Sequence, residues 1–102
     1  MSGATLIGAN LRRASFIGAI MHGVDLGGAD LSGSNLTGAY LSGANLNGAS
    51  LKEAILWGTV FFKADLTGVD MTGASMKETN LDGAILCRTK MPDGREDNSG
   101  CK

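Results

Sequence analysis

A large apolar residue stands at every fifth position of the chain, from Met1 through Leu6 and Leu11 to Met91. All 19 of these central positions are Leu, Met or Phe. The residue two places before each centre is small, most often Ala, and Gly lies two places after the centre in 13 of the first 18 five-residue words. The exceptions to Gly are Arg13, Glu53, Lys63, Glu78 and Arg88. A recurrent Gly indicates a backbone corner that has positive φ or no room for a Cβ.

The apolar positions are separated alternately by two and by three residues. Side chains two residues apart point to the same face of an extended strand, and the additional residue of the longer step requires a bend. Each word is therefore a short extended side followed by a corner, and stacked words form a β-solenoid with a continuous apolar interior. A helix is excluded, because a five-residue period would carry the apolar positions round every face and each interior glycine would cost about 1 kcal/mol.

These words resemble those of the pentapeptide-repeat family, whose word is A-[DN]-L-x-x. The matching words are ANL at 9–11, ADL at 29–31, ANL at 44–46 and ADL at 64–66. The resemblance implies an all-β fold, a right-handed quadrilateral β-helix with four words per coil. On that model the chain makes about four and a half coils and a rod of roughly 20 Å. The expected domains are 1–91, the β-solenoid, and 92–102, a C-terminal turn and capping tail.

The tail starts with Pro92, Asp93 and Gly94, which form a strong turn signal. Cys87 is expected to project outward from the last full coil, and the tail is long enough to return Cys101 to it. A disulfide between them would stabilise the fold by about 3 kcal/mol on the entropic model. A cytoplasmic protein would instead keep both thiols reduced, so the sequence leaves Cys87 and Cys101 as a possible disulfide.

Charge and hydropathy exclude some classes of protein. The formal net charge is -1, so no basic patch for nucleic acid follows from the balance. No apolar run approaches the 18 or so residues of a membrane span. The repeats begin at the first residue, which leaves no room for a signal peptide, and we expect a cytoplasmic protein.

No motif indicates catalysis. His22 is the only histidine and falls on an outward position without a second metal ligand at suitable spacing. Asp25, Asp30, Asp65 and Asp70 also point outward, too far apart for a paired-carboxylate site. The glycines match no phosphate-binding loop, and the methionines at central positions are core residues. We therefore expect no enzyme activity, no cofactor, no metal and no small-molecule substrate.

One outer surface departs from the polar pattern of the family word. With four words per coil, residues twenty apart stack, and large apolar side chains then converge near the middle of the rod. A contiguous patch of this kind commonly marks a contact surface, although single apolar side chains on a surface are also ordinary. The candidate partner-binding residues are Ile20, Tyr40, Ile55, Trp57, Val60 and Phe62.

A second copy of the chain is one candidate partner. A two-fold homodimer could form through the Trp57/Phe62 patch or through the N-terminal coil, where Leu6, Leu11 and Phe16 lie beneath an open edge. The sequence identifies no other protein partner. The principal interpretation is a non-catalytic structural or protein-interaction module.

The family resemblance also implies an alternative function. Some pentapeptide-repeat proteins resemble B-form DNA and occupy the DNA-binding surface of DNA gyrase, which protects it from drugs. Such mimicry requires a stripe of carboxylates. When the charged residues are counted separately for each side of a four-sided rod, the net charge is zero on three sides and -1 on the fourth. The sequence therefore favours an interaction module over a DNA mimic.

Overall fold

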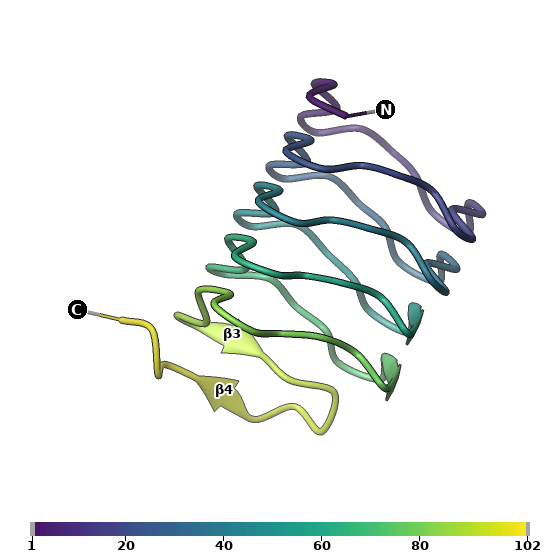
Figure 1. Cartoon of the computed structure of the whole chain (residues 1–102). Coiled ribbons are helices and arrows are strands. Elements are labelled where there is room, and N and C mark those ends of the chain that lie inside the picture. Colours follow the sequence, from purple (N-terminus) through teal and green to yellow (C-terminus); the bar gives the residue numbers. More distant parts are fainter. Residues whose placement is uncertain (1, 102) are drawn as a thin grey trace.

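The structure is a computed structural model that describes residues 2–101. The chain winds into stacked coils that advance along one axis, with the two ends of the chain at opposite ends of the stack (Figure 1). Parallel bridges join residues twenty apart along the whole stack, for example Thr5 with Asp25 and Tyr40 with Val60. Because each word has five residues, this period places four words in each coil. The molecule is an all-β solenoid, as the spacing predicts.

Four short strands are regular enough to be named. β1 (Ile55–Trp57) pairs in parallel with β2 (Ser75–Lys77). β3 (Thr89–Lys90) pairs antiparallel with β4 (Glu96–Asp97), which belongs to the tail. Elsewhere the extended part of a word is too short for more than an isolated bridge, since the corner follows at once.

Backbone hydrogen bonds connect each coil to the coils before and after it. The Asp25 amide donates to the Ala4 carbonyl at 2.9 Å, and the next amide, that of Leu26, donates to the Asn45 carbonyl at 2.7 Å. This pattern recurs at twenty-residue intervals on each side. Backbone amides and carbonyls therefore find hydrogen-bond partners in the neighbouring coils, although few of them belong to regular strands.

The corner residue of every word from Gly3 to Arg88 has positive φ. A Cβ added at Gly43 would meet nothing within 4 Å, so conformation rather than crowding explains the preference for Gly there. The corners without Gly adopt the same conformation, with φ between 51° and 58°. These corners are Arg13, Glu53, Lys63, Glu78 and Arg88.

The interior is a ladder of the central residues and the small residues beside them. Leu31 is fully buried whereas Ser32 is half-exposed, as the phase of the repeat requires. The centres of the outermost coils, such as Leu6 and Leu86, are only half-buried, because they have a neighbouring coil on one side only. Met1 lies outside the described residues.

The tail leaves the coiled path after Met91. The Gly94 amide donates to the Met91 carbonyl and closes the expected turn, and β4 then runs back along β3. The structure joins Cys87 and Cys101 by a disulfide. Among residues 2–101 there is no helix long and apolar enough to cross a membrane.

Candidate functional site

The six candidate partner-binding residues lie on two adjacent sides of the rod, and we call them the aromatic surface. Ile20, Tyr40 and Val60 stack directly, because successive bridges join them. Tyr40 is 45% exposed, Trp57 46% and Phe62 41%. Ile20 is also exposed, whereas Ile55 and Val60 are half-buried beneath their neighbours. The full set is Ile20, Tyr40, Ile55, Trp57, Val60 and Phe62.

Trp57 is held in place although it is half-exposed. Its indole Nε1 donates to Ser75 Oγ at 2.7 Å, from β1 to the next coil. The Lys77 ammonium lies 5.5 Å from the centroid of the indole ring, within the range of a cation–π interaction. These two contacts hold the indole ring in one orientation.

The other aromatic rings have similar neighbours. Lys63 Nζ lies 5.2 Å from the centroid of Phe62. The rings of His22 and Tyr40 are tilted against each other, with centroids 5.8 Å apart. His22 is thus an exposed residue at the border of the aromatic surface.

Ile17 was not among the residues predicted from the sequence, and it is 63% exposed. The twenty-residue period places Ile17 in register with Trp57, two coils away, so the same stacking rule could have found it. Ile7 and Ile85 are exposed as well. Their words lie on a different side of the rod, the side on which Thr5, Asp25, Asp65 and Ile85 are joined in one series of bridges.

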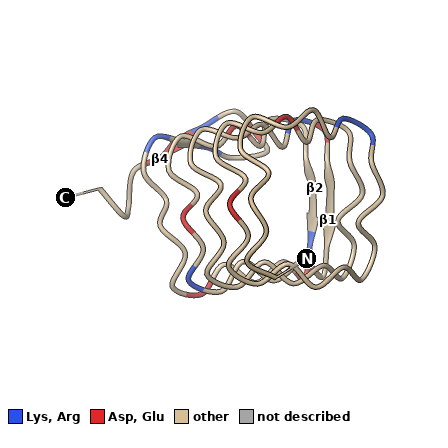
Figure 2. Ribbon diagram, turned by 90° about the horizontal axis from the view of Figure 1, so that it is seen from above, with Lys and Arg blue, Asp and Glu red and all other residues tan. Residues whose placement is uncertain are grey.

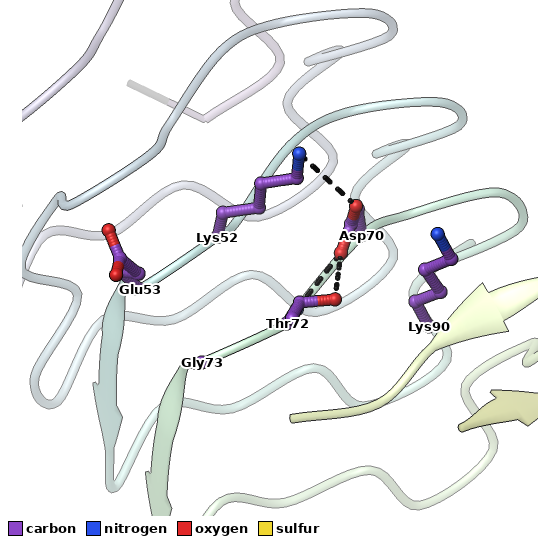
Figure 3. Close-up of a pocket in the computed structure, with 6 residues that line it drawn as sticks. All are labelled: Lys52, Glu53, Asp70, Thr72, Gly73 and Lys90. Carbon is purple, nitrogen blue, oxygen red and sulfur yellow. Dashed lines mark hydrogen bonds and ion pairs between the residues drawn. The ribbon is translucent and has the colours of Figure 1, made fainter. Parts of the chain in front are cut away.

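A polar pocket of about 350 Å³ lies on another side of the rod (Figure 3). Lys52 Nζ lies 3.7 Å from Asp70 Oδ2, and the amide and hydroxyl of Thr72 both donate to Asp70 Oδ1. The pocket residues are Lys52, Glu53, Asp70, Thr72, Gly73 and Lys90.

Asp70 in this pocket is arranged as an anion. Burial acts to raise its pKa, but the hydrogen bonds from Thr72 and the charges of Lys52 and Lys90 outweigh burial and hold the pKa below its ordinary value of 3.8. A carboxyl group of this kind is ionised at neutral pH and is a poor proton donor. In this pocket Asp70 is therefore the anion of an ion pair with Lys52 and the acceptor of two hydrogen bonds from Thr72.

Asp25 and Asp30 also have polar partners on neighbouring coils. Asn45 Nδ2 donates to Asp25 Oδ1 at 3.1 Å, and Asn45 also bridges to Asp65, so an amide lies between the two acids. Arg12 Nε lies 3.8 Å from Asp30 Oδ2. Within residues 2–101 no group of three or more His, Cys, Asp or Glu side chains is placed to hold a metal ion.

Positive and negative residues are interspersed along the coils (Figure 2). Blue and red segments occur on the same sides, as the contacts of Arg12 with Asp30 and of Lys52 with Asp70 require. The surface thus combines mixed charge with one group of exposed apolar rings.

Stacked coils of four five-residue words define a repeat protein of the β-solenoid class. The chain belongs to the pentapeptide repeat family. The family model, described as "Pentapeptide repeats (8 copies)", matches residues 1–33, 19–58, 29–68, 39–77 and 58–91. The resemblance drawn from the five-residue words is therefore confirmed.

Solved structures of this family have the same fold. HetL of the cyanobacterium Nostoc sp. strain PCC 7120, a pentapeptide repeat protein involved in heterocyst differentiation regulation, is 35% identical with a TM-score of 0.63. That comparison covers 91% of this chain and 40% of HetL. A pentapeptide repeat protein from the thylakoid lumen of Arabidopsis thaliana is 31% identical with a TM-score of 0.53, over 90% of this chain and 68% of that one.

A third structure, trypsin-treated QnrB1, is a plasmid-mediated fluoroquinolone resistance protein. It is 20% identical with a TM-score of 0.64, over 81% of this chain and 56% of QnrB1, and at that identity the likeness concerns the fold alone. No curated protein sequence matches this chain significantly.

Proposed function

We propose that this protein is a non-catalytic interaction module and that a protein partner binds the aromatic surface. The observation that carries the proposal is the grouping of four exposed large apolar side chains on adjacent sides of one rod, Ile20, Tyr40, Trp57 and Phe62. Trp and Tyr are the residue types that most often dominate the energy of an interface.

The fixed orientation of Trp57 supports this role. A side chain that is already ordered loses little conformational entropy when a partner covers it, so more of the contact energy appears as affinity. The hydrogen bond to Ser75 and the contact with Lys77 order the indole in this way. The carboxylates give little support to catalysis, because the pairings of Asp25, Asp30 and Asp70 leave them as satisfied anions.

We further infer a right-handed solenoid of about four and a half coils over residues 1–91, followed by a capping tail at 92–102. The four words per coil support the quadrilateral cross-section. The family word favours the right hand. We propose a cytoplasmic location for the protein.

The interaction is tested with surface variants of the purified chain. Immobilised wild-type protein is compared with Trp57→Ser and Phe62→Ser in capture from a lysate of the native cells. Ile7→Ser is the matched control, because Ile7 is at least as exposed but lies on another side of the rod. We expect one or more proteins to be retained by wild type and Ile7→Ser and lost from the other two variants. Equal retention by all four proteins would show that the aromatic surface is not the binding surface.

A second copy of the chain is one possible partner, and mass measurement distinguishes it. Light scattering after size exclusion at tens of micromolar gives twice the chain mass if the aromatic surface mediates a homodimer. In that case Trp57→Ser gives the single-chain mass and Ile7→Ser does not. A single-chain mass for wild type would exclude a homodimer at this concentration.

The second candidate function is action on DNA gyrase as a DNA mimic. The fold that this chain shares with QnrB1 favours it, whereas the interspersed charges of Figure 2 oppose it, because a mimic of the phosphate backbone requires a carboxylate stripe. A supercoiling assay with gyrase separates the two functions. Dose-dependent inhibition at low micromolar protein, unaffected by Trp57→Ser, would favour the mimic over the interaction module.

A further inference from the structure

The last residues of the tail, 98–101, rest on the outer surface of the final coil and are held there by few contacts. All four are exposed, so no apolar burial fixes them. The Gly100 amide donates to the Leu86 carbonyl at 2.8 Å. The Cys87–Cys101 disulfide is the covalent attachment, and it spans 14 residues of sequence. We call residues 98–101 the latch segment.

The latch segment occupies the place of a further coil. One coil earlier, the Gly68 amide donates to the Cys87 carbonyl at 2.9 Å. Arg88, twenty residues after Gly68, has no coil beyond it, and its amide donates at 2.8 Å to Asn98 Oδ1 instead. The Asn98 side chain therefore satisfies a donor on an edge that would otherwise be open to pairing.

Gly100 shows how closely the latch segment lies on this edge. A Cβ at Gly100 would stand 2.9 Å from Leu86 N and 3.3 Å from Ile85 Cγ2. The first of these contacts is with backbone, which cannot move aside cheaply. Any side chain at position 100 would push the latch segment off the coil.

We propose that the Cys87–Cys101 disulfide is a redox-operated latch that covers the coil edge at Leu86 and Arg88 when oxidised and uncovers it when reduced. A dithiol reductant supplies two electrons and two protons, the S–S bond breaks, Cys87 and Cys101 become thiols, and the dithiol closes into its own disulfide. In the reduced form the latch segment keeps only exposed hydrogen bonds, so it detaches. The solenoid core stays folded, because its buried ladder does not involve the latch segment.

The consequence is an edge whose availability follows the redox state of the compartment. In a reducing cytoplasm the edge is open, and in an oxidising compartment it is closed. β4 remains paired with β3 in both states, so opening is confined to residues 98–101. The open edge presents the free amide of Arg88, the kind of group to which an added strand binds.

Hydrogen exchange of the full chain, oxidised and after treatment with dithiothreitol, tests the latch. We expect the amides of Arg88 and Gly100 to exchange roughly ten-fold or more faster after reduction. The Leu46 amide, in the middle of the rod, serves as the internal reference, and its exchange should accelerate less than that of Arg88 and Gly100. Equal exchange at Arg88 and Gly100 in both states would overturn the proposal. An equal acceleration at Leu46 would also overturn it, because the disulfide would then stabilise the whole solenoid rather than the latch segment.

Three variants sharpen the test. Cys101→Ser should reproduce the reduced state without reductant. Gly100→Ala retains both thiols but should display fast exchange at Arg88, because its Cβ has no room against Leu86. Ile7→Ser is the control, since Ile7 is an exposed residue of the first coil, at the other end of the rod, and it should behave as wild type. Two reactive thiols per chain, counted in unfolded protein after air oxidation of the native protein, would show that the bond does not form and would end the proposal.

Discussion

Thr59 donates its hydroxyl to the Leu36 carbonyl at 2.7 Å, inside the solenoid and across 23 residues of sequence. Thr89 makes the same bond to the Leu66 carbonyl, also 23 residues before it. A hydroxyl at the small inward position of a word is thus satisfied by the neighbouring coil. Ser34 occupies the same place in its word, but its buried Oγ has no hydrogen-bond partner among residues 2–101.

Replacing Ser34 with Ala should therefore stabilise the protein. A buried hydroxyl without a partner costs about 1–3 kcal/mol, and Ala occupies this position in most other words. We expect a gain of about 1 kcal/mol in the free energy of unfolding, measured by urea denaturation. Thr59→Ala is the contrasting variant and should lose stability, because it removes a satisfied hydrogen bond and a buried methyl group. A loss of stability in both variants would show that the unpartnered Ser34 hydroxyl does not destabilise the folded protein.

The positive φ of the corner residues predicts how substitutions there change the free energy of unfolding. Gly43→Ala should cost about 1 kcal/mol although its Cβ would meet no atom within 4 Å, because an L residue is disfavoured at a φ of 68°. Glu53→Gly should have the opposite sign, with a gain of up to about 1 kcal/mol. Chemical denaturation measures both. Destabilisation by Glu53→Gly would mean that the Glu53 side chain contributes contacts worth more than the conformational cost.

Most of the fold could be predicted from the sequence, because one repeated spacing determines which side chains point inward. The burial of Leu31 and the exposure of Ser32 follow from the phase of the five-residue word alone. The stacking of residues twenty apart did not follow from spacing, since three words per coil would satisfy the same alternation. That step came from the family word, and the bridges between residues such as Tyr40 and Val60 agree with it.

The details of the site depend on contacts that periodicity does not describe. The column formed by Ile20, Tyr40 and Val60 follows from the twenty-residue period. The hydrogen bond from Trp57 to Ser75 depends on a side-chain rotamer and has no signal in the pattern. The path of the tail was likewise beyond prediction in detail, because residues after Met91 do not repeat.

Truncation of a central leucine tests how much the packing of the buried ladder contributes to stability. Leu46 is fully buried between coils on both sides, so Leu46→Ala should cost about 2–5 kcal/mol, because the stacked backbone cannot collapse into the cavity. Leu11→Ala, at a half-buried centre of the first coil, should cost less. The difference between the two midpoints of urea denaturation measures the effect. Equal costs would indicate that the ladder relaxes as readily in the middle as at its end.

Acid should weaken the fold through Asp65. Its Oδ1 accepts the Thr67 amide at 3.0 Å. The hydrogen bond from the Thr67 side chain, reinforced by this amide and by Asn47, holds the pKa of Asp65 below its ordinary value of 3.8, although burial acts to raise it. The folded state therefore binds a proton less readily than the unfolded state. The stabilisation from Asp65 is complete above pH 3.8 and is lost as the pH falls from there through the lower folded pKa.

Asp65→Asn isolates this contribution, because Asn already serves at the equivalent position of the previous coil, where Asn45 Oδ1 accepts the Asn47 amide at 2.9 Å. The variant should lose stability at neutral pH and should lose less than wild type on acidification below about pH 4. Urea denaturation at a series of pH values measures both slopes. Parallel slopes for the two proteins would mean that Asp65 has the same affinity for protons in the folded and unfolded chains, and that the hydrogen bonds from Thr67 do not favour the carboxylate.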